Sequence, residues 1–535
     1  MNVMKKLLSI LFISTLVSCQ IERPISDQQN PNVLFIVVDD LGYADLSVMG
    51  SSFYETPHID QLAKSGVIFR NGYATCAVCS PSRASLLNGQ FAARHGITQY
   101  IGAKSGQDWK SQNRHTRLLP PAYRHHLDQN DITLPEVFKE NGYATFFAGK
   151  WHLGSEQEQS LPTDHGFDIN QGGYEKGGPY SGGYFSPFNN EYMTDYEDEK
   201  GMSLSMKLAK ETSNFIKANK DSSFFAYLSF YAVHSPIQTS KKKWEKYRNK
   251  AEAQGINEIG FEMERVLPAR KYQDNPVYAG LIEQVDDAVG SVMQTLKELN
   301  LDKNTIVVFT SDNGGVTSGD NFSTNQLSLR GGKGYQWEGG VRVPYFVHVP
   351  WMNQEGQEIT TPVSGVDFYP TLLDLVGINN NTNHPVDGVS LRPLLEGGSI
   401  SPRPLFWHYP HYGNQGGEPC SIIREETWKL IYYWEDQHIE LYNLNTDQSE
   451  TTDVALEYEE LALGMKEKLL DWLKEMDTEY ALEDPEWDES AWKQKLAKNK
   501  NVLMPRLEKT RMDMLDPNWK PNEDWWGSEI DSIQK

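Results

Sequence analysis

The sequence predicts an α/β fold in which helices flank a large, mostly parallel sheet on both faces, followed by a smaller C-terminal α+β domain. Four continuous apolar runs, rich in Val, Ile and Phe, lack polar alternation, as expected of strands buried on both faces. Helical patterns lie between these runs, and strands that alternate with helices favour a parallel sheet. The length of 535 residues exceeds what one core usually holds, which favours a second, smaller domain.

Each of the four predicted strands ends in a polar cluster. The strands are expected at residues 33–38, 144–148, 224–231 and 306–309. The clusters that follow them are, in order, Asp39-Asp40, Gly149-Lys150-Trp151-His152, His234-Ser235-Pro236 and Asp312-Asn313. Because ligands of open α/β sheets bind at the carboxyl ends of the strands, these clusters are expected to meet at one edge of the sheet.

The helical and C-terminal elements follow from spacing. Apolar residues in 278–300 recur on one helical face: Ile282, Val285, Val289, Val292, Leu296 and Leu299. Strands are expected at 429–434 and 439–444, and a helix at 457–476. We therefore expect a larger N-terminal domain over 30–389 and a C-terminal subdomain with a tail over 390–535. One hypothesis is that the tail wraps the main domain through Trp519, Trp525 and Trp526.

The N-terminus has the pattern of a targeting segment. Lys5 and Lys6 precede an apolar stretch over 7–17, which is too short to span a membrane and suits a signal peptide over 1–18. The end of this stretch resembles a bacterial lipobox, which implies lipid attachment at Cys19. An ordinary signal peptide is the alternative. We expect an exported protein in the periplasm or at the cell surface, held to the outer membrane by the lipid anchor alone.

The formal net charge of −23 argues against nucleic acid as a partner, since a duplex binder normally has a basic face. An anionic substrate would be repelled at long range, so local cations or a metal would have to attract it. The simpler interpretation of the charge by itself is that it keeps a secreted protein soluble.

Cysteine use leaves several options open. Cys76 and Cys79 form a Cys-x-x-Cys that could be a redox pair or half of a zinc site, although the sequence has no second pair. Cys79 could also be an ordinary buried thiol. Cys76 and Cys420 could pair, which sequence cannot decide.

The paired acidic residues at two strand ends predict a metal site. A carboxylate at the end of a buried strand is costly unless it is paired or bound to a metal. Four oxygen donors without His or Cys favour calcium or magnesium over zinc. The four donors are Asp39, Asp40, Asp312 and Asn313.

The run Cys79-Ser80-Pro81-Ser82-Arg83, followed by Leu86-Leu87-Asn88-Gly89, resembles the signature of type I, formylglycine-dependent sulfatases of the alkaline phosphatase superfamily. Asn88 departs from the usual Thr at a peripheral position. Further matches are Gly149-Lys150-Trp151-His152-Leu153-Gly154, His234, Lys333 and Glu338-Gly339-Gly340-Val341-Arg342-Val343-Pro344. The resemblance covers roughly residues 30 to 480 and extends to bacterial sulfatases that degrade polysaccharides.

This resemblance implies that a formylglycine-generating maturation enzyme oxidises Cys79 to formylglycine (3-oxoalanine). One hydroxyl of the aldehyde hydrate would attack sulfur and the other would later expel sulfate. One calcium ion would be held by Asp39, Asp40, Asp312, Asn313 and the converted Cys79.

The resemblance also implies roles for the basic residues. Arg83 would bind the hydrate, Lys150 the sulfate, and His152 would accept a proton. His234 and Lys333 would bind the sulfate and leaving oxygens. Lys150 and His152 lie two residues apart on a segment expected to be extended, which would point both side chains the same way.

Two loop segments are candidates for contact with substrate. The first is a basic cluster that could bind a polyanionic glycan or be a solvated flap: Arg114, His115, Arg117, Arg124, His125 and His126. The second is the aromatic, Gly-rich segment 407–417, which suits stacking on sugars or interdomain packing.

The function hypothesis is an exo-acting sulfatase whose partner is a sulfated oligosaccharide. One alternative is a phosphate or phosphonate ester hydrolase of the same superfamily. Another is a glycan-binding lipoprotein that never converts Cys79 and catalyses nothing.

Overall fold

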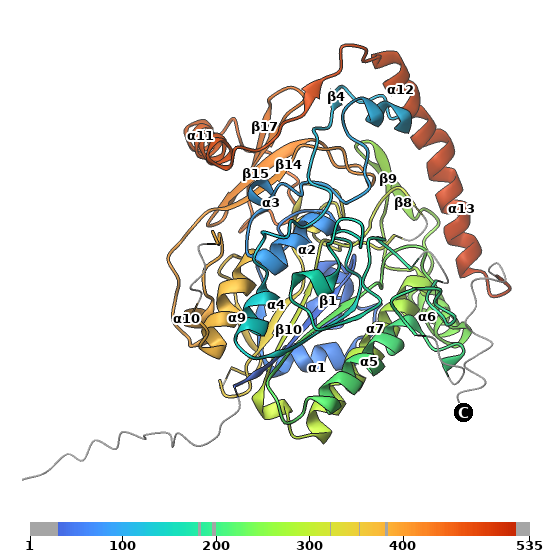
Figure 1. Cartoon of the computed structure of the whole chain (residues 1–535). Coiled ribbons are helices and arrows are strands. Elements are labelled where there is room, and N and C mark those ends of the chain that lie inside the picture. Colours follow the sequence, from blue (N-terminus) through green and yellow to red (C-terminus); the bar gives the residue numbers. More distant parts are fainter. Residues whose placement is uncertain are drawn as a thin grey trace, which may run out of the picture.

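The computed structural model of the protein describes residues 30–179, 183–194, 199–320, 323–352, 354–379 and 384–520. An eight-stranded sheet lies at the centre of the larger domain (Figure 1). Its strands, in spatial order, are β12 (Gln357–Ile359), β2 (Val67–Phe69), β11 (Tyr345–His348), β10 (Thr305–Ser311), β1 (Asn32–Val38), β7 (Phe224–Phe230), β5 (Ala144–Gly149) and β6 (Ile169–Gln171). Only β11 runs antiparallel to its neighbours, so the predicted mostly parallel sheet is confirmed.

Helices cover both faces of this sheet, which explains the unbroken apolar runs. In β1, Leu34 and Ile36 face one core, whereas Val33 and Phe35 face the other. The first core is covered by α1 (Pro57–Ser65), α5 (Leu204–Ala218), α6 (Lys241–Gln254) and α7 (Pro276–Glu298). The second is covered by α2 (Cys79–Asn88), α4 (Leu134–Glu140), α9 (Phe368–Val376) and α10 (Arg392–Leu395). Figure 1 shows these two groups on opposite sides of the sheet.

The start of α7 illustrates how local sequence sets an element. The Asn275 side chain accepts hydrogen bonds from the backbone N–H groups of Val277 and Tyr278, at 3.1 and 3.2 Å. Pro276, at the first helical position, has no N–H that would need a partner there. The helix therefore begins two residues before the predicted residue 278.

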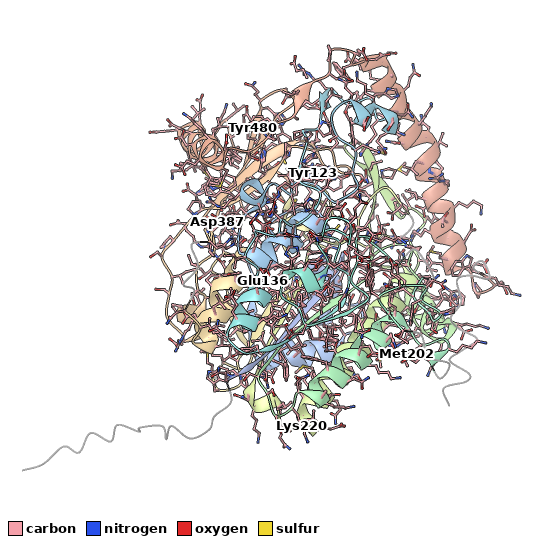
Figure 2. The ribbon with its side chains drawn as sticks, viewed as in Figure 1. Tyr123, Glu136, Met202, Lys220, Asp387 and Tyr480 are labelled. Carbon is pink, nitrogen blue, oxygen red and sulfur yellow. The ribbon has the colours of Figure 1, made fainter. Side chains whose placement is uncertain are left out.

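A four-stranded antiparallel sheet forms the smaller C-terminal domain. Its strands are β14 (Leu405–Tyr409), β15 (Cys420–Glu425), β16 (Trp428–Tyr433) and β17 (Ile439–Asn443). Helix α11 (Glu459–Met476) packs on one face, and Tyr480 beyond it lies 4.8 Å from the Trp434 ring (Figure 2). The opposite face packs against Tyr73 and Trp337 of the larger domain. The predicted division at residue 390 remains a prediction.

The C-terminal tail packs on the larger domain. Strand β18 (Leu482–Glu483) pairs with β4 (Leu118–Leu119). The chain continues through α12 (Glu489–Lys498), η8 (Asn499–Leu503) and α13 (Met504–Leu515), drawn in red in Figure 1. At its end the Trp519 ring lies 5.8 Å from the Trp244 ring of α6.

Several sequence predictions fall on residues that the structure does not describe. The expected signal peptide over 1–18, the lipidation at Cys19, and the packing of Trp525 and Trp526 lie outside the described residues. Among the helices of the described ranges, none has the length and apolar character needed to cross a bilayer.

Candidate active site

The polar clusters after β1 and β10 lie side by side because these strands are parallel neighbours. Val38 at the end of β1 pairs in register with Ser311 at the end of β10. The Ser311 hydroxyl donates a hydrogen bond to the Val38 carbonyl at 2.8 Å, which fixes the two strand ends together. Asp39 and Asp40 therefore lie beside Asp312, and the Asp40 N–H donates to Asp312 Oδ1 at 3.2 Å.

Three buried carboxylates form the base of the site. Asp39, Asp40 and Asp312 are at most 2% exposed, and oxygen atoms from all three lie within 4.8 Å of one another. The Asn313 amide donates to Asp40 Oδ1 at 2.9 Å. Within the described part of the chain, Asn313 Oδ1 and Asp39 Oδ1 are buried without a hydrogen-bond donor. A buried oxygen without a donor is costly, and this all-oxygen set fits a hard cation such as calcium.

Each carboxylate has a buried cation at 2.6 or 2.7 Å. The pairs are Arg83–Asp312, Lys150–Asp39 and Lys333–Asp40. Burial raises the pKa of the Asp39 carboxyl above its ordinary value despite the nearby Lys150. Burial would also raise the pKa of Asp40, but Lys333 and His234 hold it below its ordinary value. Three cations against three carboxylates balance the charge, so an added divalent cation would make the site attractive to an anion.

Helix α2 is tied to the sheet through Arg83. The helix begins at Cys79, and all ten of its residues are buried. Arg83 Nη1 donates to the Lys150 carbonyl at 2.8 Å and to the Ser229 hydroxyl at 2.7 Å. The guanidinium therefore links α2 to the ends of β5 and β7, beneath the site.

Cys79 and His152 face one another at the start of α2. Cys79 Sγ lies 3.5 Å from His152 Nδ1. His152 Nε2 lies 3.1 Å from the Ile101 carbonyl oxygen. Because a carbonyl can only accept a hydrogen bond, Nε2 carries the proton and Nδ1 of the neutral ring is the acceptor that faces Cys79. Burial raises the pKa of the Cys79 thiol above its ordinary value, although Lys150 opposes it. An unconverted Cys79 is therefore a thiol and not a ready thiolate nucleophile.

The backbone route to His152 differs from the expected extended segment. Gly149 has φ of +105° and His152 has φ of +58°, so the chain turns twice between β5 and the site. The alternation argument for Lys150 and His152 is therefore wrong, although both side chains reach the site. A Cβ on Gly149 would lie 1.7 Å from the Ser229 carbonyl oxygen, so only glycine allows this turn.

A cavity of about 420 Å³ opens above these groups. Five of the predicted site residues line it: Asp40, Cys79, His152, His234 and Lys333. His234 Nε2 lies 3.9 Å from Asp40 Oδ2, and burial together with Lys333 lowers the pKa of His234 to about 3. The remaining predicted residues lie beneath the cavity: Asp39, Arg83, Lys150, Asp312 and Asn313. In particular, the Lys150 ammonium binds Asp39, and its expected contact with sulfate remains a prediction.

Further cavity residues had weak or no sequence signals. Asn414 and Gln415 line the cavity and belong to the aromatic segment 407–417, whereas Trp407 in that segment is buried and donates to the Ala74 carbonyl at 2.8 Å. Tyr100, Glu175 and Asp320 also line the cavity. No pattern in the sequence marked these three residues, because each lies in a loop.

The predicted basic cluster divides in the structure. Arg124 pairs with Asp131 at 2.8 Å, and the Arg117 guanidinium lies 5.8 Å from the centre of the Trp487 ring. Arg114 instead reaches Asn414 at the cavity rim, at 3.1 Å. Only part of this cluster is therefore placed to meet a substrate.

The cysteines of the described residues are all free, buried thiols. They are Cys76, Cys79 and Cys420. The disulfide considered for Cys76 and Cys420 is therefore not formed in this structure, and Cys79 is not consumed by a disulfide.

Comparison with known proteins places this arrangement in a family. The family model described as Sulfatase matches residues 31–378, and the model described as N-sulphoglucosamine sulphohydrolase, C-terminal, matches 332–475. A protein named "Sulfatase" from Formosa agariphila is 31% identical, over 87% of this chain and 92% of its own length. Human N-acetylgalactosamine-6-sulfatase is 29% identical, over 71% of this chain and 68% of its own length.

Solved structures agree with this placement. The structure of "Ps i-CgsB" has a TM-score of 0.68 and 28% identity, and the match covers 90% of this chain and 99% of that one. The same protein has been solved with k-i-k-neocarrahexaose bound. The mostly parallel sheet and the carboxylate cluster at its edge agree with these matches. The chain therefore belongs to the sulfatase family, whose enzymes hydrolyse sulfate esters.

Proposed function

We propose that the enzyme removes sulfate from sulfated oligosaccharides, with Cys79 converted to formylglycine and one calcium ion bound by Asp39, Asp40, Asp312 and Asn313. The main support is the position of Cys79, which lies at the start of a buried helix, lines the cavity and faces the free acceptor nitrogen of His152. When present, the aldehyde hydrate supplies the nucleophilic hydroxyl and the metal supplies positive charge.

The cation set supports the calcium part of the proposal. Three lysine and arginine side chains already balance the three carboxylates, and two buried oxygens still lack donors among the described residues. A hard divalent cation would satisfy these oxygens and leave excess positive charge towards the cavity. At short range, where a sulfate group would sit, this local positive charge attracts the anion more strongly than the net charge of −23 on the whole chain repels it.

The chain's own residues have distinct proposed roles. His152 accepts a proton through Nδ1 from the group at position 79, because the Ile101 carbonyl holds its other nitrogen as a donor. Lys333 and His234 line the cavity beside Asp40, so we assign them to the sulfate and leaving oxygens. Arg83 and Lys150 position the buried carboxylates.

The names of relatives support a carbohydrate substrate. The human relative is named for N-acetylgalactosamine-6-sulfate chemistry, and the Ps i-CgsB structure holds an oligosaccharide. The targeting pattern before Cys19 supports export, and we propose that a lipid on Cys19 tethers the enzyme to the membrane.

Replacement of Cys79 tests the mechanism. We expect Cys79→Ala to abolish sulfate release from nitrophenyl sulfate and from sulfated oligosaccharides, while the thermal unfolding midpoint changes little. Cys76→Ala is the matched control, since Cys76 is an equally buried thiol that does not line the cavity. Mass spectrometry of the peptide containing Cys79 establishes whether the aldehyde is present.

Retained turnover in Cys79→Ala would refute the covalent role. Nitrophenyl phosphate run beside nitrophenyl sulfate separates a sulfatase from a phosphate or phosphonate ester hydrolase, because both reactions fit a cationic cavity. Sugar binding without any turnover by the aldehyde form would favour a non-catalytic glycan-binding protein instead.

A further inference from the structure

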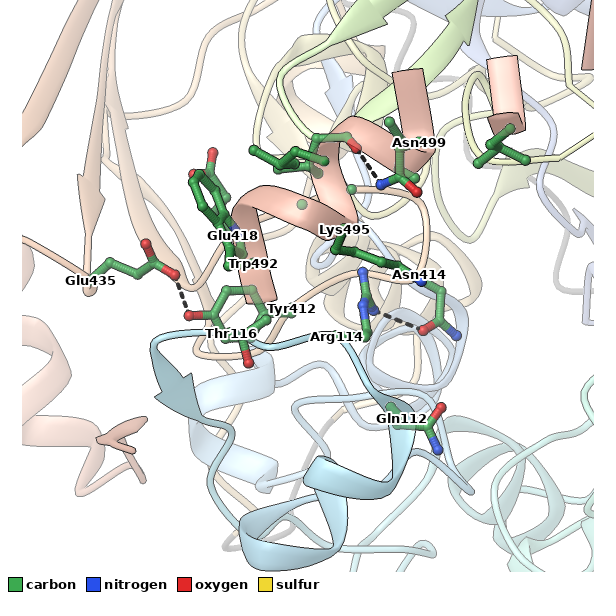
Figure 3. Close-up of a pocket in the computed structure, with 16 residues that line it drawn as sticks. Gln112, Arg114, Thr116, Tyr412, Asn414, Glu418, Glu435, Trp492, Lys495 and Asn499 are labelled. Carbon is green, nitrogen blue, oxygen red and sulfur yellow. Dashed lines mark hydrogen bonds between the residues drawn. The ribbon is translucent and has the colours of Figure 1, made fainter. Parts of the chain in front are cut away.

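A second cavity, of about 470 Å³, adjoins the first (Figure 3). Asn414 lines both cavities. Its Nδ2 donates to the Tyr100 hydroxyl, in the wall of the first cavity, at 2.7 Å. Its Oδ1 accepts a hydrogen bond from Arg114, in the wall of the second, at 3.1 Å. The two cavities therefore share a wall residue, and a chain of sugars that occupies the first extends towards the second.

Most of the walls of the second cavity come from three separate parts of the chain, and Val266, Leu267 and Glu435 complete them. These three parts are the segment around Arg114, the loop around Tyr412, and the C-terminal elements, in which α12 contributes Trp492 and Lys495 and η8 contributes Leu503. Figure 3 shows the side chains of these three parts pointing towards one space. The matches to the two family models end at residues 378 and 475, before α12 begins. The part of the wall that α12 and η8 form is therefore built by a segment beyond the residues that the family models match.

The C-terminal wall is fixed before any ligand arrives. The Asp484 N–H donates to the Arg117 carbonyl at 2.9 Å, and Trp487 Nε1 donates to the His115 carbonyl at 3.1 Å. The Asp488 side chain caps α12, and Asn499 at the end of α12 donates to the Val266 carbonyl at 2.8 Å. A cavity with walls tied at both ends of the helix needs little ordering to bind a ligand.

Two cations, Arg114 and Lys495, line this cavity together with two carboxylates, of which Glu418 is paired with Arg265 and Glu435 accepts a hydrogen bond from Tyr412. Arg114 donates only to neutral oxygens, on Asn414 and on the Gly413 carbonyl at 2.6 Å. Within the described part of the chain, neither Arg114 nor Lys495 forms an ion pair. In a protein with 73 acidic residues against 50 basic ones, two such cations beside one cavity favour an anionic ligand.

The other side chains of this cavity suit a sugar ring. Tyr412 and Trp492 offer apolar ring surface, against which the C–H face of a sugar can pack. The Glu418 carboxylate binds Arg265, and the Glu435 carboxylate accepts from the Tyr412 hydroxyl, so both remain in place as acceptors for sugar hydroxyls.

We propose that this cavity binds a second sugar residue of the substrate, one that carries its own sulfate or carboxylate group, through Arg114 and Lys495. The proposal rests on the proposed function, since it extends the same substrate. The enzyme would then prefer sulfated oligosaccharides to single sulfated sugars, and the C-terminal helix would determine that preference.

The test compares Lys495→Ala and Trp492→Ala with Lys498→Ala, a control that removes the same charge from an exposed position of α12 outside the cavity. The measured quantity is the ratio of kcat/KM for k-i-k-neocarrahexaose, or for a 6-sulfated chondroitin tetrasaccharide, to kcat/KM for nitrophenyl sulfate. We expect the Lys495→Ala ratio to fall about fivefold to tenfold, mostly through KM, and the fall to shrink in 0.5 M salt.

Calorimetric titration of the same two oligosaccharides into the Cys79→Ala protein gives an independent readout. There, Lys495→Ala and Trp492→Ala should weaken binding of at least one oligosaccharide, and Lys498→Ala should not. Two results would overturn the second-sugar site. The first is that the wild type turns over but the kcat/KM ratio and the oligosaccharide affinities are unchanged in all three variants. The second is that neither oligosaccharide binds. Binding that depends on Lys495 without any turnover by the wild type would overturn the proposed function and leave this site standing.

Discussion

The buried ion cluster between the two domains allows a direct test through Lys429→Met. Lys429 Nζ on β16 of the smaller domain lies 3.1 Å from Glu338 Oε1 and 2.8 Å from Glu450 Oε1. Glu338 belongs to the larger domain, where it begins α8 (Glu338–Val341). All three side chains are at most 1% exposed, so water cannot replace the ammonium once it is removed.

The loss can be worked out from these contacts. Glu338 keeps Arg342 at 3.7 Å and the Tyr73 hydroxyl at 2.6 Å, but Glu450 loses its one ion-pair partner in the described structure. Removing one partner of a buried ion pair costs about 3–5 kcal/mol of unfolding free energy. Burial raises the pKa of Glu450 to about 7 even with Lys429 present.

The sign of the pH dependence follows from that pKa. A carboxyl whose pKa is raised by folding binds more protons in the folded state than in the unfolded state, so stability falls as pH rises towards the folded pKa. Without Lys429 the pKa of Glu450 rises further. We therefore expect the stability deficit of Lys429→Met to be larger at pH 8 than at pH 6.

Urea unfolding at both pH values, followed by tryptophan fluorescence, measures this deficit. Trp337 and Trp407 are buried where the domains meet, so their emission reports on that contact. Lys468→Met is the matched control, because Lys468 is 60% exposed and pairs with Glu425 at 2.9 Å on the surface of the same domain. An exposed pair contributes about 0–1 kcal/mol. Equal losses in the two variants, or a Lys429→Met deficit that does not depend on pH, would refute the reasoning.

Three further predictions concern calcium, a turn and a buried histidine. Calcium added after chelation should raise the thermal unfolding midpoint of the wild type but not that of Asp312→Asn. The control is Asp287→Asn, in the separate group of His58, Asp286 and Asp287, which should keep the calcium-induced rise. A full calcium-induced rise in Asp312→Asn would contradict the proposed site. Gly149→Ala should cost more than about 3 kcal/mol, since its Cβ would meet a carbonyl oxygen at 1.7 Å, whereas Gly464→Ala on exposed helix surface should stabilise by about 0.5–1 kcal/mol. Burial lowers the pKa of His95 to about 3, so the unfolded state binds the proton first and stability falls as pH drops below about 6.5. His95→Gln should remove about 2.5 kcal/mol of that fall between pH 6.5 and 4.5 in urea titrations, and identical pH profiles would count against a neutral buried His95.

The sequence by itself was sufficient for the elements that local pattern specifies. An unbroken apolar run such as residues 33–38, short and rich in Val and Ile, favours a strand covered on both faces, because any open face would expose it to water. Carboxylates at the ends of two such parallel strands had to meet at one edge, and Asp40 and Asp312 do. The run beginning at Cys79 carried the family resemblance, and the family models support it.

Tertiary structure decided what depends on contacts between distant segments. The sequence predicted an extended segment from Lys150 to His152, but the chain turns there. The turn at Gly149 depends on how closely β5 packs against β7. No pattern joined Arg114 to Lys495, since they share a cavity only because β18 pairs with β4 and carries the C-terminal helix there. Such pairings arise from the burial and hydrogen bonding of whole surfaces, which no short stretch of sequence encodes. The sequence thus determined the family and the polar residues at the strand ends, and the tertiary structure decided which of them line the cavity and which lie beneath it.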